Sequence, residues 1–322
     1  MRTTFVQLAA SAGLAALAPS LAYANCGSAF CTVNTDWNVQ GVYAEPGARA
    51  ELRYEYLNQD QPRHGSQAVD VGEIPAHHDE VSTLNQALFA TFDYNWASGW
   101  GVSAIVPVVK REHEHIHNHQ GEQITEEWNY TALGDIRLAG RYQFPLGAAN
   151  PAKPQTLGLV FGVTLPTGST TETNDEGEPA ERSLQPGTGT TQPFLGAYYQ
   201  LRLPARGLFF FAQGAYGWPV DSYHEYKPGD RLTIDLGMRY EATPRVGLLL
   251  QLNALWKGRD SGEQAEPEDS GGQYFFLSPG VSVLVTPKVQ LFALVQLPIY
   301  QYVNGVQLTA SWGATAGIGV RF

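Results

Sequence analysis

The feature that most constrains this chain is the alternation of apolar and polar residues, which recurs along nearly the whole sequence. In residues 48–57, ARAELRYEYL, small or apolar side chains alternate with charged ones. The same pattern returns in DIRLAGRYQF at 135–144 and in RLTIDLGMRYE at 231–241. Successive side chains of a β-strand point to opposite faces, so this pattern predicts long strands with one apolar and one polar face.

Twelve such segments can be counted, and their connections alternate in length. Tight connections such as Ser98-Gly99 alternate with five long polar ones at 59–82, 110–133, 167–191, 219–230 and 258–272. This layout predicts an all-β transmembrane antiparallel up-and-down β-barrel over residues 46–322, with short periplasmic turns and long extracellular loops. The expected strands are 47–58, 83–97, 100–109, 134–144, 156–166, 192–203, 208–218, 231–241, 246–257, 273–285, 289–299 and 307–322.

A membrane location follows from the number of long apolar faces. A soluble β-sandwich also alternates, but a closed barrel pairs every backbone N–H and C=O while its apolar face meets lipid. The last segment, LTASWGATAGIGVRF, ends in Phe322, and a terminal aromatic of this kind resembles the signal read by the barrel-assembly machinery. The expected surroundings are outer-membrane lipid and lipopolysaccharide.

The amino terminus predicts export. Residues 1–24 contain Arg2, the apolar stretch LAASAGLAALAPS and the small-residue motif AYA, which together indicate a cleaved signal peptide. Export places the barrel in the outer membrane of a Gram-negative bacterium. The following segment, 25–45, holds Cys26 and Cys31, which we expect to form a disulfide in an exported chain. This segment could plug the barrel.

Three stretches carry a family resemblance: LGDIRLAGRYQF at 133–144, LVFGVTLPTGS at 159–169 and SLQPGTGTTQPFLGAYYQ at 183–200. They resemble the outer-membrane proteins of the meta-pathway of phenol degradation family, which are identified as transporters. The resemblance implies a barrel that passes small, often hydrophobic or aromatic solutes. It transfers no substrate-binding residue, and it does not include the histidine-rich stretch or the cysteine segment.

Side chains predicted to point into the lumen are of two kinds. The charged ones could form ion pairs that brace the wall, or a constriction that selects solutes. The apolar ones, such as Phe209, Phe211 and Phe292, could line a path for a hydrophobic solute or pack against the amino-terminal segment. The charged set is Arg49, Glu51, Arg53, Glu55, Asp135, Arg137, Arg141, Asp235 and Arg239, with Asp93 and Glu241 beside them.

The stretch KREHEHIHNHQGE at 110–122 places four histidines at alternate positions. If the strand continues outward, these imidazoles share one face, and imidazole is a good ligand for Zn²⁺ or Cu²⁺. The alternative is a solvated tract that binds metal weakly. The predicted metal ligands, all on extracellular loops, are His113, His115, His117, His119, His77 and His78.

Function is narrowed by what the sequence lacks. The chain carries a net charge of −11, which disfavours nucleic acid, and it has none of the common serine-hydrolase, P-loop or zinc-protease motifs. We therefore expect no enzyme and no required cofactor. Two functions remain: an outer-membrane channel for small solutes, hydrophobic or aromatic ones among them, or a surface metal-binding (Zn/Cu) or structural barrel that acts through its histidine-rich loops.

Overall fold

The computed structural model describes residues 33–40, 46–75, 78–119, 122–146 and 153–322. One short 3-10 turn, η1 (Pro204–Arg206), accompanies the strands. The strands are β1 (Gly47–His64), β2 (Gln67–Ala68), β3 (His78–Asn95), β4 (Trp100–His119), β5 (Glu122–Leu133), β6 (Arg137–Leu146), β7 (Gln155–Thr164), β8 (Gln192–Leu203), β9 (Leu208–Gly217), β10 (Arg231–Glu241), β11 (Val246–Lys257), β12 (Gly272–Thr286), β13 (Val289–Val303) and β14 (Val306–Arg321).

In the described part of the chain, no helix has the length and apolar character needed to cross a membrane.

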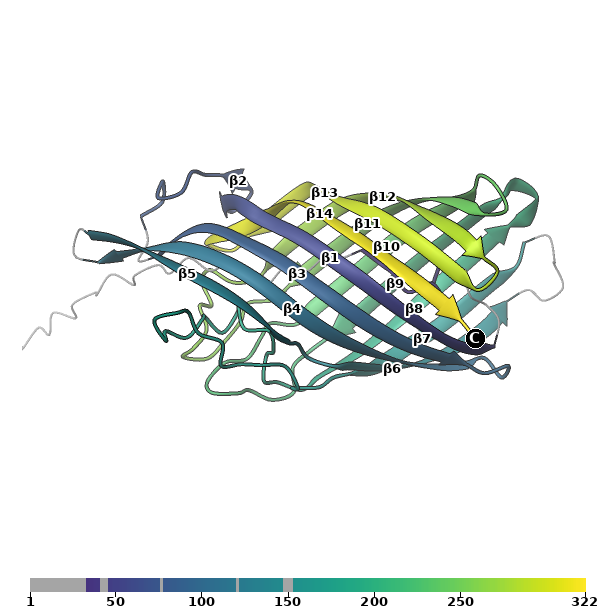
Figure 1. The fold of residues 1–322 in the computed structure, drawn as a ribbon, viewed down its shortest axis with the longest axis horizontal. Helices are drawn as coiled ribbons and strands as arrows, with labels where there is room; N and C mark the ends of the chain where they lie inside the picture. Colours follow the sequence, from purple (N-terminus) through teal and green to yellow (C-terminus); the bar gives the residue numbers. More distant parts are fainter. Residues whose placement is uncertain (1–32, 41–45, 76–77, 120–121, 147–152) are drawn as a thin grey trace, which may run out of the picture.

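The strands form one closed antiparallel barrel. Each pairs with its neighbours in sequence, and β14 pairs with β1 from Arg49 opposite Arg321 to His64 opposite Val306. Strand β4 pairs with β6 near the turn at 96–99 and with β5 further out, so β5 and β6 together form one broken strand of the wall. Strand β2 only extends β1. The barrel therefore has twelve strands, which confirms the predicted fold, and Figure 1 shows them tilted around a common axis.

The sequence pattern sets the two faces of the wall. On β4, the outward positions from Trp100 to Val108 are apolar, and the next outward residues are Lys110, Glu112 and Glu114. An apolar band of about nine to eleven residues per strand is what a tilted strand needs to cross the hydrocarbon layer. The part of β4 beyond residue 110 therefore lies outside the membrane.

The predicted loops at 59–82 and 110–133 are the main error of the sequence-based prediction. Strand β1 continues to His64, β3 starts at His78, and β4 and β5 form a hairpin that extends beyond the rest of the wall (Figure 1). Outside lipid a strand needs no apolar face, so its sequence can be polar on both faces and then resembles the sequence of a loop. Strand pairing and contacts on the inner face hold this extension.

Candidate functional site

Residues 33–40 lie inside the barrel. The backbone N–H of Asn34 donates to Gln251 Oε1 at 3.0 Å, and its side chain donates to Gln213 at 2.6 Å and to Asp235 at 3.0 Å. On another part of the wall, the side chain of Gln200 donates to the carbonyl oxygen of Val39 at 2.7 Å. The segment is therefore bound by strands β8 to β11 through specific hydrogen bonds. The expected disulfide of Cys26 and Cys31 falls outside the described residues.

Apolar contacts fix the same segment. Trp37 is 1% exposed, its ring centroid lies 4.8 Å from that of Phe292, and its indole N–H donates to Glu51 at 2.7 Å. Two clusters of buried side chains surround the segment. One contains Val33, Trp37, Leu249, Phe292 and Leu294, and the other Val39, Val160, Phe194, Tyr198, Phe209 and Phe211. The inward apolar residues on these strands thus pack against the amino-terminal segment.

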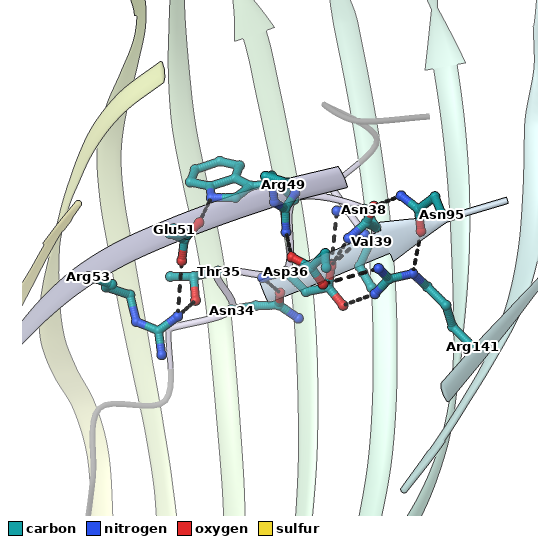
Figure 2. Close-up of polar contacts among 12 residues, drawn as sticks. Asn34, Thr35, Asp36, Asn38, Val39, Arg49, Glu51, Arg53, Asn95 and Arg141 are labelled. Carbon is teal, nitrogen blue, oxygen red and sulfur yellow. Dashed lines mark hydrogen bonds and ion pairs between the residues drawn. The ribbon is translucent and has the colours of Figure 1, made fainter. Parts of the chain in front are cut away.

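Most of the charged side chains predicted in the lumen pair with each other, and Figure 2 shows the contacts of Arg49, Arg53 and Arg141. Arg141 contacts Asp93 at 3.1 Å and Asp36 of the segment at 3.7 Å, and Arg49 also pairs with Asp93. A second network joins Arg53 to Glu55 at 2.9 Å and to Glu51 at 3.3 Å. Paired charges of this kind brace the wall and hold the segment.

The remaining predicted lumen charges have different surroundings. Asp235 is buried and accepts hydrogen bonds from Asn34 and Asn253, while Arg239 pairs with the exposed Glu241 at 3.4 Å. Asp135 lies in the break between β5 and β6, not on a strand. It accepts hydrogen bonds from the backbone N–H groups of Gly168 and Thr188, so it anchors the loop between β7 and β8.

One part of the wall, from β6 to β10, combines small residues with an aromatic and a charged one. A row of paired positions runs through Ala139, Gly162, Phe194, Gly217 and Arg231. Apart from Phe194, these residues are only partly buried.

On β6, Arg137 is the next lumen-facing residue after Ala139, towards the outer end of the barrel. It is exposed, and its guanidinium carbon lies 3.8 Å from the centroid of the Phe194 ring. No hydrogen bond or ion pair of Arg137 is found among the described residues. This side of the interior therefore combines small apolar surface, an aromatic ring and two cations, Arg137 and Arg231.

A second site lies at the outer end, on the inner face of β3, β4 and β5. Register places Glu80, His115 and Glu126 in one row across the three strands. The next row towards the membrane contains Thr83, His113 and Trp128, and the next row away from the membrane pairs His78 with His117. All of these histidines lie beyond the membrane-facing band, and His113 and His115 are 3% and 2% exposed.

The imidazole nitrogens face each other and nearby carboxylates. His113 Nε2 lies 3.3 Å from His115 Nδ1 and 3.7 Å from Glu80 Oε2. His115 Nε2 lies 2.8 Å from Glu126, and the ring of His78 stacks on that of His115 with centroids 4.6 Å apart. The sets Glu80, His113, His115 and His78, His115, Glu181 each offer three ligand atoms within 4.8 Å of one another. The arrangement can hold a metal ion.

Glu181 comes from the loop between β7 and β8. Burial and the nearby Glu80 carboxylate raise the pKa of Glu181 well above its usual range. Burial also lowers the pKa of His113, as do the neighbouring His115 and Arg111, so this imidazole is neutral at physiological pH. The cluster thus brings a neutral imidazole close to a buried carboxyl group whose ionised form is disfavoured.

The other predicted metal ligands are placed differently. His117 lies at the edge of the cluster, 3.6 Å from Glu126, while His77 and the side chain of His119 lie outside the described residues. His64 and His224 are exposed elsewhere. Sequence reasoning missed Glu80, Glu126 and Glu181. For Glu80, the HHDE motif at 77–80 was an available signal, but nothing in the sequence connects Glu181 to this place.

Comparison with known proteins identifies the fold. A family model described as putative MetA-pathway of phenol degradation matches residues 64–304. The chain is similar to the COG4313 outer membrane channel from Pseudomonas putida F1, with a TM-score of 0.62 and 14% identity over 87% of this chain and 97% of that one.

Weaker similarities are to the KdgM porin and to the Pseudomonas putida toluene transporter TodX. For KdgM the TM-score is 0.44, with 9% identity over 85% of this chain and 99% of that one. For TodX it is 0.41, with 10% identity over 94% of this chain and 100% of that one. No curated protein matches the sequence.

Proposed function

The chain belongs to the putative MetA-pathway of phenol degradation family, and we propose that it is an outer-membrane channel for small, largely apolar solutes. The observation that carries this proposal is that residues 33–40 occupy part of the interior. A porin for hydrated solutes needs a water-filled lumen. Here part of that space is occupied by a segment that both hydrogen bonds and apolar contacts hold.

The solute path in this proposal follows the wall from β6 to β10. Partly buried positions there, such as Ala139 and Ala215, offer apolar surface to a solute. Arg137, which is exposed and held over the ring of Phe194, would meet the hydroxyl or carboxylate of an aromatic solute at the outer end. A small aromatic molecule fits these surroundings better than a sugar does.

Narrowing this path tests the proposal. Ala215 points inward, whereas Ala197 on the neighbouring strand is exposed on the outward face, so Ala215→Leu and Ala197→Leu add the same side chain to opposite faces. The assay is the uptake of N-phenyl-1-naphthylamine, which fluoresces in phospholipid, by cells whose general porins are deleted.

Ala215→Leu should slow the uptake several-fold, while Ala197→Leu should leave it at the wild-type rate. Equal rates for the wild type and both variants, or uptake no faster than in cells without the protein, would contradict the proposed route.

A further inference from the structure

We propose that His78, Glu80, His113, His115 and Glu181 bind a divalent transition-metal ion, for which Zn²⁺ is the probe, at the outer mouth of the barrel. The inference is independent of the transported solute. It rests on how five side chains from β3, β4 and the loop between β7 and β8 converge. Nitrogen and carboxylate ligands in this proportion suit Zn²⁺ and its neighbours better than Ca²⁺ or Mg²⁺, which prefer oxygen.

The spacing of the two central nitrogens fits a metal ligand pair. Two imidazole nitrogens at zinc-bond lengths of about 2.0–2.1 Å and a tetrahedral angle lie about 3.3 Å apart. His113 Nε2 and His115 Nδ1 are separated by 3.3 Å. The Glu80 oxygen, 3.7 Å from His113 Nε2, needs only a small shift to become the third ligand.

In both His113 and His115, the ring nitrogen that faces away from the proposed metal position already lies next to a polar side chain. His113 Nδ1 lies 3.0 Å from the Thr83 hydroxyl, and His115 Nε2 lies 2.8 Å from the Glu126 carboxylate. Metal-binding histidines usually have their second nitrogen hydrogen-bonded in this way, because the bond fixes the tautomer and the ring orientation. Thr83 and Glu126 therefore orient the inner nitrogens towards a common point.

Charge also favours a bound cation. Neither carboxylate oxygen of Glu181 is exposed, and neither has a hydrogen-bond partner among the described residues; the nearest imidazole nitrogen, His78 Nδ1, is 3.7 Å away. The adjacent Arg182 donates instead to the carbonyl oxygens of Thr170 and Thr188. A buried carboxylate in such a place is costly unless a cation neutralises it.

The two ligand sets share His115, so a metal ion bound by one set lies next to the residues of the other set. Glu181 belongs to the loop between β7 and β8, which also contacts β4 and β5 where the Leu184 carbonyl accepts from Arg111 and Tyr130. A bound ion would thus fasten this loop to the β3–β4–β5 sheet at the mouth of the barrel.

Zinc titration of the intact, metal-free barrel in detergent tests the site, with a chromophoric chelator as competitor. We expect one Zn²⁺ per chain with a Kd below micromolar, and a loss of at least 100-fold in affinity in the double variant H113A/H115A. The matched control H64A/H224A removes two exposed histidines outside the cluster and should bind as the wild type does. Weak binding that both double variants retain would overturn the proposal and would mean adventitious binding to exposed histidines.

A conservative variant guards against misfolding of the double variant. Glu181→Gln keeps the size of the side chain and should weaken Zn²⁺ binding by at least tenfold. Zn²⁺ should slow hydrogen exchange in the loop at 165–191 of the wild type but not of this variant. Exchange that Zn²⁺ leaves unchanged in the wild type would refute the fastening of the loop, and unchanged affinity in Glu181→Gln would remove this residue from the site.

Discussion

Replacing Trp37 with alanine should release the segment that occupies part of the interior. The side chain is 1% exposed, packs edge-on against Phe292, and donates its indole N–H to Glu51. Truncation of a buried tryptophan typically costs about 3–5 kcal/mol. Here the cost falls on the docking of residues 33–40, because the hydrogen bonds of the wall do not depend on this side chain.

The consequence for the channel can be estimated from that free energy. Each 1.4 kcal/mol is a factor of ten in an equilibrium constant, so the population with a displaced segment should rise by about two to four orders of magnitude. A displaced segment leaves room for water and ions. Single-channel recordings in planar lipid bilayers should therefore show long, frequent openings in Trp37→Ala that are rare in the wild type.

Two controls make the result specific. Trp37→Phe keeps an aromatic ring and much of the packing but loses the indole N–H and some volume, so it should open much less often than Trp37→Ala. Trp96→Ala removes a tryptophan that is 44% exposed and should conduct as the wild type does. If Trp37→Ala conducts no more than the wild type while remaining a folded barrel, residues 33–40 do not limit ion flow.

Three further predictions concern stability. Arg141→Ala leaves Asp93 and Asp36 without this buried partner, so the free energy of unfolding in urea should fall by about 3–5 kcal/mol, whereas the exposed Arg206→Ala should change it little. A Cβ on Gly237 would lie 2.0 Å from the Phe211 ring, so Gly237→Val should reduce the refolding yield, and Gly214→Val, where a Cβ would come no nearer than 3.9 Å to a neighbour, should not. Burial raises the pKa of Asp269 from 3.8 to about 6. Because the folded pKa is the higher one, the loop at 258–271 should lose stability, by at most about 3 kcal/mol, as pH rises from about 4 to about 6. Its protection factor, which corrects for the intrinsic acceleration of amide exchange with pH, should then fall over this range in the wild type but not in Asp269→Asn.

The membrane-crossing strands could be predicted because lipid imposes a strict rule on them. The expected bounds 192–203, 231–241 and 246–257 coincide with β8, β10 and β11. In these strands every outward position must be apolar, so the alternation is visible residue by residue. The family resemblance at 133–200 is likewise confirmed by the match over 64–304.

Beyond the lipid the outward positions of a strand need not be apolar, and the sequence-based prediction of strand bounds was less accurate there. Strand β4 continues to His119 through residues that are polar on both faces, so its last ten residues were expected to form a loop. The alternation of the histidines did indicate a shared face. It could not show that this face is buried, because the burial depends on a loop that follows more than forty residues later and brings Glu181 to His115.

The most direct test of the proposed channel is to locate a solute inside it. Crystals of the intact barrel soaked in 4-bromophenol would show the bromine by anomalous scattering. The proposed path predicts a peak inside the barrel, beside the row of Ala139, Gly162 and Phe194. Bromine only on the outward face, or none within the barrel at a concentration that saturates the crystal, would contradict a path for small apolar solutes through this interior.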